Sequence, residues 1–183
     1  MKQLALALAA TTAFAISIPA APAIASIETV EAKSTAASAA SIALGDMFET
    51  FGNKSLKPGQ YLWRDVPESA GAERVVVSLS DQLAFLYRGD ELMAVSTISS
   101  GTSKTPTPTG IFNILEKKRM HHSRKYDNAP MPFMQRIDRF GVALHAGHLP
   151  GRPASHGCVR LPSQFAAKLF STTDVGTPVL IGA

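Results

Sequence analysis

The chain has 183 residues, of which 45% are hydrophobic and 17% charged, and these values suit one globular domain with a real hydrophobic core. The formal net charge of +4 fits an anionic surface or substrate, but it is too small to indicate a nucleic-acid-binding protein. The single cysteine excludes an internal disulfide as a source of stability.

The N-terminus has the pattern of a secretory signal peptide. Met1-Lys2 precedes an apolar run from Leu4 to Ile18, and Ala23-Ile24-Ala25 fits the small-x-small cleavage pattern. The alternative is a membrane anchor, but the run is short for a span of ~20 residues. We therefore expect residues 1–25 to be removed on export. The protein would then meet the membrane only during export and would work in the periplasm or cell wall.

The next segment, residues 26–72, is predicted to be a flexible tether and arm. Residues 26–45 are rich in Ala, Ser and Thr, a composition typical of a tether with some transient helix. Tyr61-Leu62-Trp63 follows a Pro-Gly turn and predicts a short strand or a packed arm. The folded domain is expected to span residues 73–183.

Six segments of this domain have the composition and length of strands. They are residues 74–79, 83–87, 92–98, 110–115, 142–145 and 179–181. No helical pattern separates the first three, which predicts an antiparallel meander. One short helix is expected after Pro162, with Phe165, Leu169 and Phe170 on one face.

Residues 116–139 are predicted to form a lid or binding loop. They carry seven Lys and Arg against three acids, and no helix or strand period is sustained. A loop of this length in a compact domain is usually a lid or disordered. A solvated charged loop is the alternative, but apolar Met131 and Phe133 need something to pack against, so we expect them to contact a substrate. The pair His121-His122 is given no role.

The candidate site is the stretch of residues 145–160, which contains Cys158 and three of the five histidines. A single cysteine with nearby histidines is a candidate nucleophile with its base. The thiolate is the reactive form, so the sulfur needs a base or a cationic setting. His145 ends a predicted strand, and the Gly- and Pro-rich loop that follows can fold back to bring its imidazole to the sulfur.

The neighbours of the cysteine have supporting roles. The N–H groups of Gly157 and Cys158 are expected to face a developing oxyanion, since Gly157 allows a close approach of the backbone. If residues 158–160 are extended, Arg160 shares the face of the thiol and can contact substrate. His156 is expected to support the site rather than to remove the proton, and His148 to be an exposed loop residue. A zinc site is the alternative, but the spacing of these side chains is not a standard structural zinc pattern.

Specific motifs give a family resemblance. Ser155-His156-Gly157-Cys158-Val159-Arg160, preceded by Leu144-His145-Ala146-Gly147, resembles the signature of the L,D-transpeptidase catalytic domain, the YkuD-type domain. Thr107-Pro108-Thr109-Gly110 is similar to that family's loop before a central strand, and Ala129-Pro130-Met131-Pro132 to its lid segment. The resemblance covers roughly Val75 to Ile181.

The resemblance implies a fold and a reaction. The fold would be mostly β, a sandwich- or barrel-like mixed sheet with one or two short helices. Cys158 would be the acyl-accepting nucleophile, His145 the general base, and Gly157 and Cys158 the oxyanion site, supported by Ser155 and His156. The substrate would be peptidoglycan stem peptides: a tetrapeptide donor loses D-Ala and an amine takes the acyl group. No cofactor and no metal would be needed.

Alternatives remain for the function. Water as acceptor would give an L,D-carboxypeptidase or an endopeptidase that releases attached protein, and a wall-attached protein is a further candidate acceptor. The spacer from His145 to Ser155 is shorter than in better-known members with a longer lid, so the acceptor stays open. A non-catalytic wall-binding module would not need the intact His-Gly-Cys grouping. A papain-like protease would need its histidine far downstream of the cysteine, whereas here the histidine comes first.

Overall fold

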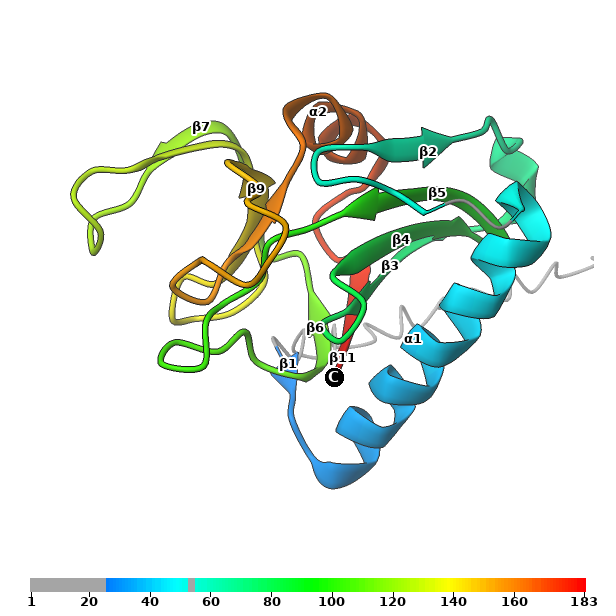
Figure 1. The fold of residues 1–183 in the computed structure, drawn as a ribbon, viewed down its shortest axis with the longest axis horizontal. Helices are drawn as coiled ribbons and strands as arrows, with labels where there is room; N and C mark the ends of the chain where they lie inside the picture. Colours follow the sequence, from blue (N-terminus) through cyan, green and yellow to red (C-terminus); the bar gives the residue numbers. More distant parts are fainter. Residues whose placement is uncertain (1–25, 53–54) are drawn as a thin grey trace, which may run out of the picture.

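The computed structural model describes residues 26–52 and 55–183, and the predicted signal peptide lies outside this part of the chain. Two mixed sheets and two α-helices make up the described fold, with one short 3-10 turn, η1 (Glu68–Ala70) (Figure 1). The seven-stranded sheet has the order β1 (Ser26–Ile27), β6 (Gly110–Asn113), β11 (Pro178–Gly182), β3 (Glu73–Ser78), β4 (Leu83–Arg88), β5 (Glu91–Thr97) and β2 (Tyr61–Trp63). The four-stranded sheet has the order β10 (Val159–Leu161), β9 (Ala143–Ala146), β8 (Pro130–Arg136) and β7 (Glu116–His122). The expectation of a mostly β fold with a mixed sheet and one or two helices is confirmed, although one helix is longer than expected, with 22 residues.

The meander of β3, β4 and β5 is confirmed by antiparallel pairing along both ladders. The chain returns at its end to place β11 parallel to β3 and antiparallel to β6 in the middle of the sheet. The predicted arm, Tyr61–Trp63, adds an edge strand to β5. The last strand of the chain therefore ties the loop-bearing strand β6 to the meander.

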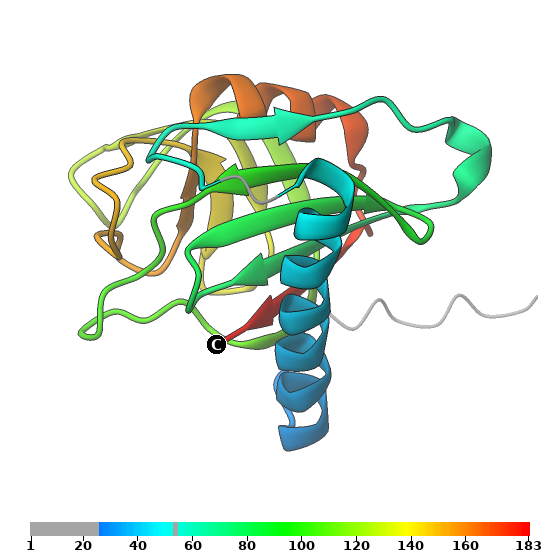
Figure 2. The ribbon, with the colours of Figure 1, turned by 45° about the vertical axis from the view of Figure 1, so that its right-hand side comes forward.

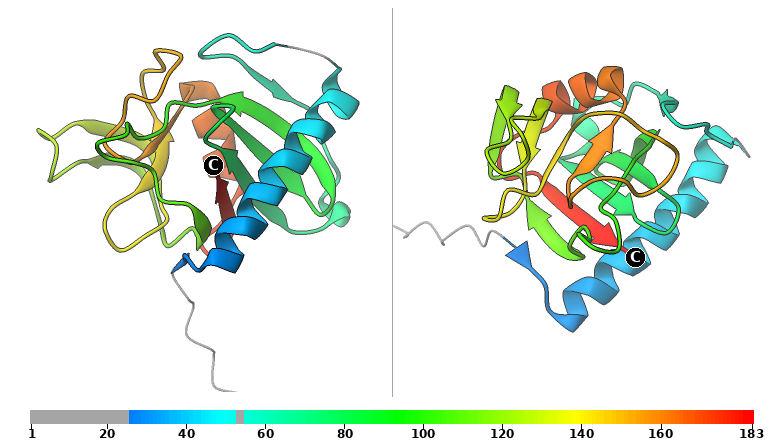
Figure 3. Two further views of the ribbon diagram at one scale, coloured as in Figure 1. Left: turned by 60° about the horizontal axis from the view of Figure 1, so that its bottom comes forward. Right: turned by 60° about the vertical axis from the view of Figure 1, so that its left-hand side comes forward.

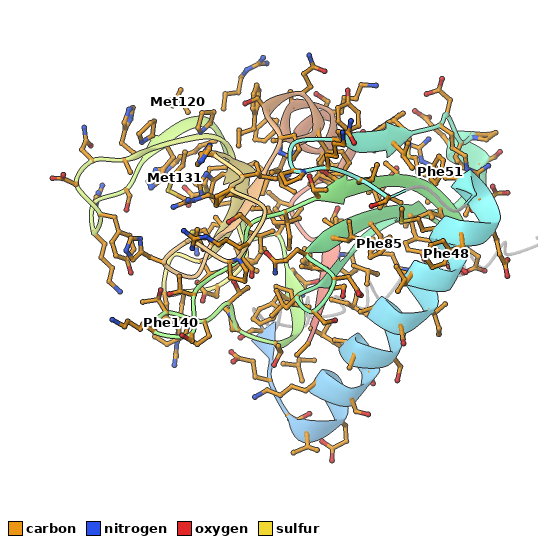
Figure 4. The ribbon with its side chains drawn as sticks, viewed as in Figure 1. Phe48, Phe51, Phe85, Met120, Met131 and Phe140 are labelled. Atoms are coloured by element: carbon orange, nitrogen blue, oxygen red, sulfur yellow. The ribbon has the colours of Figure 1, made fainter. Side chains whose placement is uncertain are left out.

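Both faces of the seven-stranded sheet are buried, which explains the continuous apolar run Val75-Val76-Val77 in β3. Val75 and Val77 point into a core shared with the four-stranded sheet and with α2 (Ser163–Thr172), while Val76 points to the opposite face with Phe85. Phe85 lies on the side of the sheet that faces the long helix α1 (Figure 4). Alternation along an extended chain assigns these neighbours to two separate cores.

The tether prediction for residues 26–45 is wrong, because α1 (Val30–Phe51) is a helix of 22 residues that packs across the outer face of the sheet (Figure 2). Its buried face consists of small side chains at helical spacing with one methionine: Ala32, Ala36, Ala40, Ala43 and Met47. The Thr29 hydroxyl caps its first turn by accepting from the Ala32 N–H at 3.2 Å. The Tyr87 hydroxyl donates to Asp46 Oδ2 at 2.6 Å and fixes the helix to β4.

The close contact between α1 and the seven-stranded sheet depends on a glycine, which has no side chain, in β11. A Cβ at Gly182 would lie 2.6 Å from the Ala36 carbonyl oxygen, so β11 can approach α1 only with glycine there. The alanine-rich composition that suggested a tether is thus the composition of a closely packed interface. No helix in the described ranges, 26–52 and 55–183, is long and apolar enough to cross a membrane.

The predicted loop of residues 116–139 is instead largely a β-hairpin. β7 and β8 pair antiparallel from Glu116↔Arg136 to His122↔Pro130, and the hairpin projects away from the seven-stranded sheet (Figure 1). Most β7 side chains are exposed, so backbone pairing holds this strand and no apolar face produces a detectable period. The hairpin still extends over the catalytic stretch. That its tip acts as a lid over the site remains a prediction.

Candidate active site

Cys158 directly precedes β10 (Val159–Leu161). The loop from residue 147 returns to the sheet at this point, in the orange part of the ribbon (Figure 3). β10 pairs parallel with β9, and the register sets Val159 opposite Leu144 and Arg160 opposite His145. Val159 and Leu144 are fully buried in the core between the sheets. Alternation then sends Cys158 and Arg160 to the opposite face of this sheet, as the sequence predicted for an extended stretch, and the register places His145 on the same face.

An apolar cluster buries the sulfur. Met131, Met134 and Ala143 form the cluster, and Cys158 packs against it half-buried. Met131 and Met134 are three residues apart, a spacing that a regular strand would send to opposite faces. Phe133 between them has φ of 55°, in the left-handed region, and this irregularity shifts the alternation by one residue.

The same irregularity removes Phe133 from the site. Its ring packs against Phe170 of α2 with centroids 6.0 Å apart, whereas Met131 lines the pocket at the cysteine. The expectation of a substrate contact therefore keeps its structural basis for Met131 only. Phe133 instead fastens the hairpin to the helix.

Ser155 organises the backbone around the nucleophile. Its hydroxyl donates to the Cys158 carbonyl oxygen and accepts from the Gly157 N–H at 3.1 Å. The structure differs here from the expectation that the Gly157 N–H faces an oxyanion, because that donor is already used. Ser155 itself is buried, and its supporting role has a concrete form in these two bonds.

The imidazole of His145 is held in one tautomer. Its Nδ1 lies 2.8 Å from the Ala146 carbonyl oxygen, which can only accept, so Nδ1 carries the proton. Nε2 is then the unprotonated acceptor, as a general base requires. His145 is buried and lines the same pocket as Cys158.

Burial makes both partners neutral at rest. It lowers the pKa of His145; the bond to the Ala146 carbonyl acts against this lowering, and the electrostatic effect of the nearby Arg160 and His121 adds to it. Burial also raises the pKa of the Cys158 thiol; the Ala143 N–H, which donates to the sulfur, and Arg160 act against this rise, and Asp138 adds to it. At neutral pH the pair is therefore thiol and neutral imidazole, and the proton must move during attack.

Asp138 is a site residue that sequence reasoning missed. Its buried carboxylate accepts from the N–H groups of Phe140 and Val142 at 2.9 and 2.8 Å and so shapes the turn between β8 and β9. That turn supplies the Gly141 carbonyl oxygen, which lies 3.8 Å from the sulfur. The sequence signal that could have identified Asp138 is its position as an acidic residue within a basic segment.

The backbone of Arg160 is fixed, and its guanidinium pairs with no acid among the residues that the structure describes. Its N–H and C=O both bond to Ser99 at 3.0 Å, and its stem lies against Gly147, where a Cβ would be 3.0 Å from Arg160 carbons. A salt bridge to a loop acid such as Asp174 would be an alternative to substrate contact, but Asp174 lies 4.0 Å from Lys117 instead. Arg160 forms no ion pair within the described part of the chain, and it lines the pocket.

A pocket of about 310 Å³ joins these groups. Its lining includes His148 and His156 in addition to Cys158, His145 and Arg160. His156 is exposed, and its ring stacks on Tyr126 at the hairpin tip with centroids 4.4 Å apart and planes at 16°. The hairpin tip thus touches the catalytic loop directly, through a tyrosine that the sequence did not single out.

The zinc alternative gains no support from the geometry. Among the described residues, no group of three or more His, Cys, Asp or Glu side chains is arranged to hold a metal ion. His145 uses Nδ1 for a backbone bond and His156 stacks on Tyr126, so the two rings serve different purposes.

Comparison with known proteins agrees with this geometry. The family model of the L,D-transpeptidase catalytic domain matches residues 72–181, more than half of the chain. The chain therefore belongs to the L,D-transpeptidase catalytic domain family, the YkuD family. A comparison with curated protein sequences gives no match.

Similar solved structures support the same fold. The chain is similar to an L,D-transpeptidase from Xylanimonas cellulosilytica (26% identity, TM-score 0.56, covering 65% of this chain and 64% of that one). It is similar to L,D-transpeptidase 1 from Mycobacterium tuberculosis (25% identity, TM-score 0.54, covering 61% and 62%). An L,D-transpeptidase from Stackebrandtia nassauensis, at 23% identity and TM-score 0.57 with 74% and 64% covered, shows the fold alone. The matched part spans less than two thirds of the length of each of these chains.

The charge of Asp138 is testable through the thiol. Asp138→Asn keeps an oxygen that can accept from the Phe140 and Val142 N–H groups, but removes the negative charge that helps to raise the pKa of Cys158. Removing an anion favours the thiolate, so the apparent pKa for alkylation by iodoacetamide should fall and alkylation at pH 7.5 should become faster. The pH profile of alkylation measures this, with Asp81→Asn as a control, because Asp81 is not among the groups that shift the pKa of Cys158. A midpoint that stays in place or rises would contradict it.

Proposed function

We propose that this protein is an exported L,D-transpeptidase, a cysteine acyltransferase acting on peptidoglycan stem peptides. The observation that supports it most is a thiol and a tautomer-fixed imidazole lining one pocket, Cys158 with its proton available and His145 with Nε2 free to accept it. Membership of the L,D-transpeptidase family supports stem peptides as the general substrate class. Export is proposed on the signal pattern of residues 1–25.

The acylation half-reaction uses only the chain's own groups. The Cys158 sulfur attacks the carbonyl carbon between the third residue of a tetrapeptide stem and its terminal D-Ala, while its proton passes to His145 Nε2. A carbon–sulfur bond forms and the carbonyl electron pair moves onto oxygen. When that pair returns, the carbon–nitrogen bond breaks and D-Ala leaves as an amine with the proton from the imidazolium.

The second half-reaction returns the enzyme to its starting state. An amine of another stem, or of a wall-attached protein, attacks the thioester and gives its proton to His145. The carbon–sulfur bond breaks and the sulfur takes the proton back. Water in place of the amine would release a tripeptide stem, so the acceptor alone distinguishes transfer from hydrolysis. Thiol, base and a backbone N–H donor suffice for both steps, so no cofactor enters the proposal.

Mass spectrometry of purified muropeptides after incubation with the enzyme tests this function. Crosslinked dimers with loss of D-Ala are expected with the wild-type protein and none with Cys158→Ala, whose circular dichroism should match the wild type. Trimmed tripeptides without crosslinks would identify a carboxypeptidase. Products from Cys158→Ala within tenfold of the wild-type rate would exclude the covalent mechanism.

Two histidines in the pocket should differ in their effect on turnover. His145→Ala removes the proposed base and should lower kcat by ~10²–10⁴-fold, the usual contribution of a general base. His148→Ala removes an exposed side chain at the pocket wall and should cost much less. Turnover of a tetrapeptide donor measures both. Equal losses would mean that the base is assigned to the wrong residue.

Arg160 is proposed to bind a carboxylate of the donor stem. Its guanidinium lines the pocket on the face of the nucleophile and is not used by any acid of the described chain. Stem peptides carry carboxylates close to the scissile amide. Arginine can hold such a group through two parallel hydrogen bonds, a geometry that lysine cannot reproduce.

The carboxylate contact predicts a substrate-dependent defect. Arg160→Lys should lower kcat/KM for a free-acid donor by roughly 1.5–3 kcal/mol, the range for a hydrogen bond to a charged group. For a donor amidated at that carboxylate, which cannot form this contact, kcat/KM should be nearly the same in Arg160→Lys and in the wild type. Steady-state kinetics with the two donors provide the measurement. Equal losses for both donors, or a defect confined to thermal stability, would assign Arg160 to holding the loop.

A further inference from the structure

The peptide groups around the nucleophile are almost completely used. The Gly157 N–H donates to Ser155 Oγ at 3.1 Å, and the Ser155 hydroxyl donates to the Cys158 carbonyl oxygen. The Gly157 carbonyl oxygen accepts from Thr107 Oγ1 at 2.8 Å. Of the four N–H and C=O groups of residues 157 and 158, only the Cys158 N–H has no partner among the described residues.

We propose that Thr107 is a positioning residue that aims the Cys158 N–H at the carbonyl oxygen of the acyl donor. The peptide between Gly157 and Cys158 is trans, so its C=O and N–H point in opposite directions. Thr107 holds the C=O on the side of the loop of residues 99–109, which does not line the pocket. The N–H is thereby turned to the other side, toward the pocket. This inference rests on the proposed acyl-transfer function.

The Thr107 hydroxyl is itself fixed in direction. It is buried, and it accepts from the Gly101 N–H at 2.8 Å while donating its single proton to Gly157. Pro106 and Pro108 flank it, so φ is preset on both sides and the residue before Pro108 is confined to an extended conformation. Gly101 is packed so closely that a Cβ there would lie 2.2 Å from the Thr105 carbonyl oxygen. The hydroxyl therefore has a rigid support.

One aimed donor matters more here than in a site with several. As the sulfur attacks, the carbonyl oxygen of the donor gains negative charge, and a preorganised N–H lowers the energy of that state more than that of the ground state. Deleting one such donor typically costs ~10²–10³-fold in kcat. Losing only its support should cost less, because the peptide can still reach the productive orientation part of the time.

The test compares two reactions of the same sulfur. With p-nitrophenyl acetate the sulfur attacks the ester carbonyl, an oxyanion forms, p-nitrophenolate leaves and an acetyl thioester remains. With iodoacetamide the sulfur displaces iodide and no oxyanion forms. Thr107→Val should slow acetylation by about tenfold or more and leave alkylation near the wild-type rate. Thr107→Ser, which restores the hydroxyl, should recover acetylation.

The matched control is Thr102→Val in the same loop, which breaks a hydroxyl contact with Thr105 at 3.1 Å but none with Gly157. It should leave both rates unchanged. Equal slowing of acetylation and alkylation by Thr107→Val, or no recovery with serine, would overturn the proposal and leave Thr107 a structural residue. Thr107→Ala serves as the second variant if valine prevents folding.

A measurement on the wild-type protein does not depend on any variant. N-acetyl-L-alaninal adds to the thiol as a hemithioacetal whose oxygen occupies the oxyanion position. In ¹⁵N-labelled protein the Cys158 amide proton should move strongly downfield on addition, while the Gly157 proton, bonded to Ser155, stays in place. A matching shift at Gly157, or none at Cys158, would refute the inference. Neither probe requires a stem peptide. A lack of activity toward muropeptides would therefore overturn the proposed function but not the proposed role of Thr107.

Discussion

Burial of the Cys158 sulfur against Met131, Met134 and Ala143 is the constraint on which the rest of the site depends. A desolvated thiol keeps its proton, so the site cannot work from a stored thiolate and needs a base that is itself neutral. Burial of His145 supplies that base, and its bond to the Ala146 carbonyl selects the tautomer. The two pKa shifts have opposite signs for one reason: a low-dielectric site disfavours whichever form is charged.

The scaffold meets this constraint by pairing one short strand with two segments. β10 pairs with β9 on one side, which fixes His145 relative to Arg160, and with Ser99 on the other. Ser99 follows directly from the meander, so the seven-stranded sheet supports the nucleophile through a continuous set of backbone bonds. The α1 helix, by covering the far face, allows this sheet to be apolar on both sides and rigid.

The sequence was sufficient for features that depend on local chemistry. The motif of residues 155–160, the meander and the helix after Pro162 follow from residue types at short spacing, and the structure contains them. It was insufficient where packing between residues distant in the sequence determines the local structure. The alanines of α1 have a helical spacing that becomes meaningful only with a sheet to bury them, and β7 is a strand because of its partner and not its own faces. The hydrogen bonds to the Gly157 peptide and the turn at Asp138 join residues distant in sequence or follow from loop geometry.

A neutral resting thiol also suits the proposed working environment. Oxidants and disulfides react with the thiolate, so a raised pKa lowers the fraction of Cys158 open to those reactions. The same shift would slow acyl transfer if deprotonation had to precede binding. Placing the base in the pocket removes that conflict, because the proton leaves only when a carbonyl carbon is present to take the electron pair. One arrangement therefore both protects the thiol from oxidation and makes it a nucleophile toward a bound donor. The sulfur packs against an apolar cluster, and a tautomer-fixed imidazole lies in the same pocket.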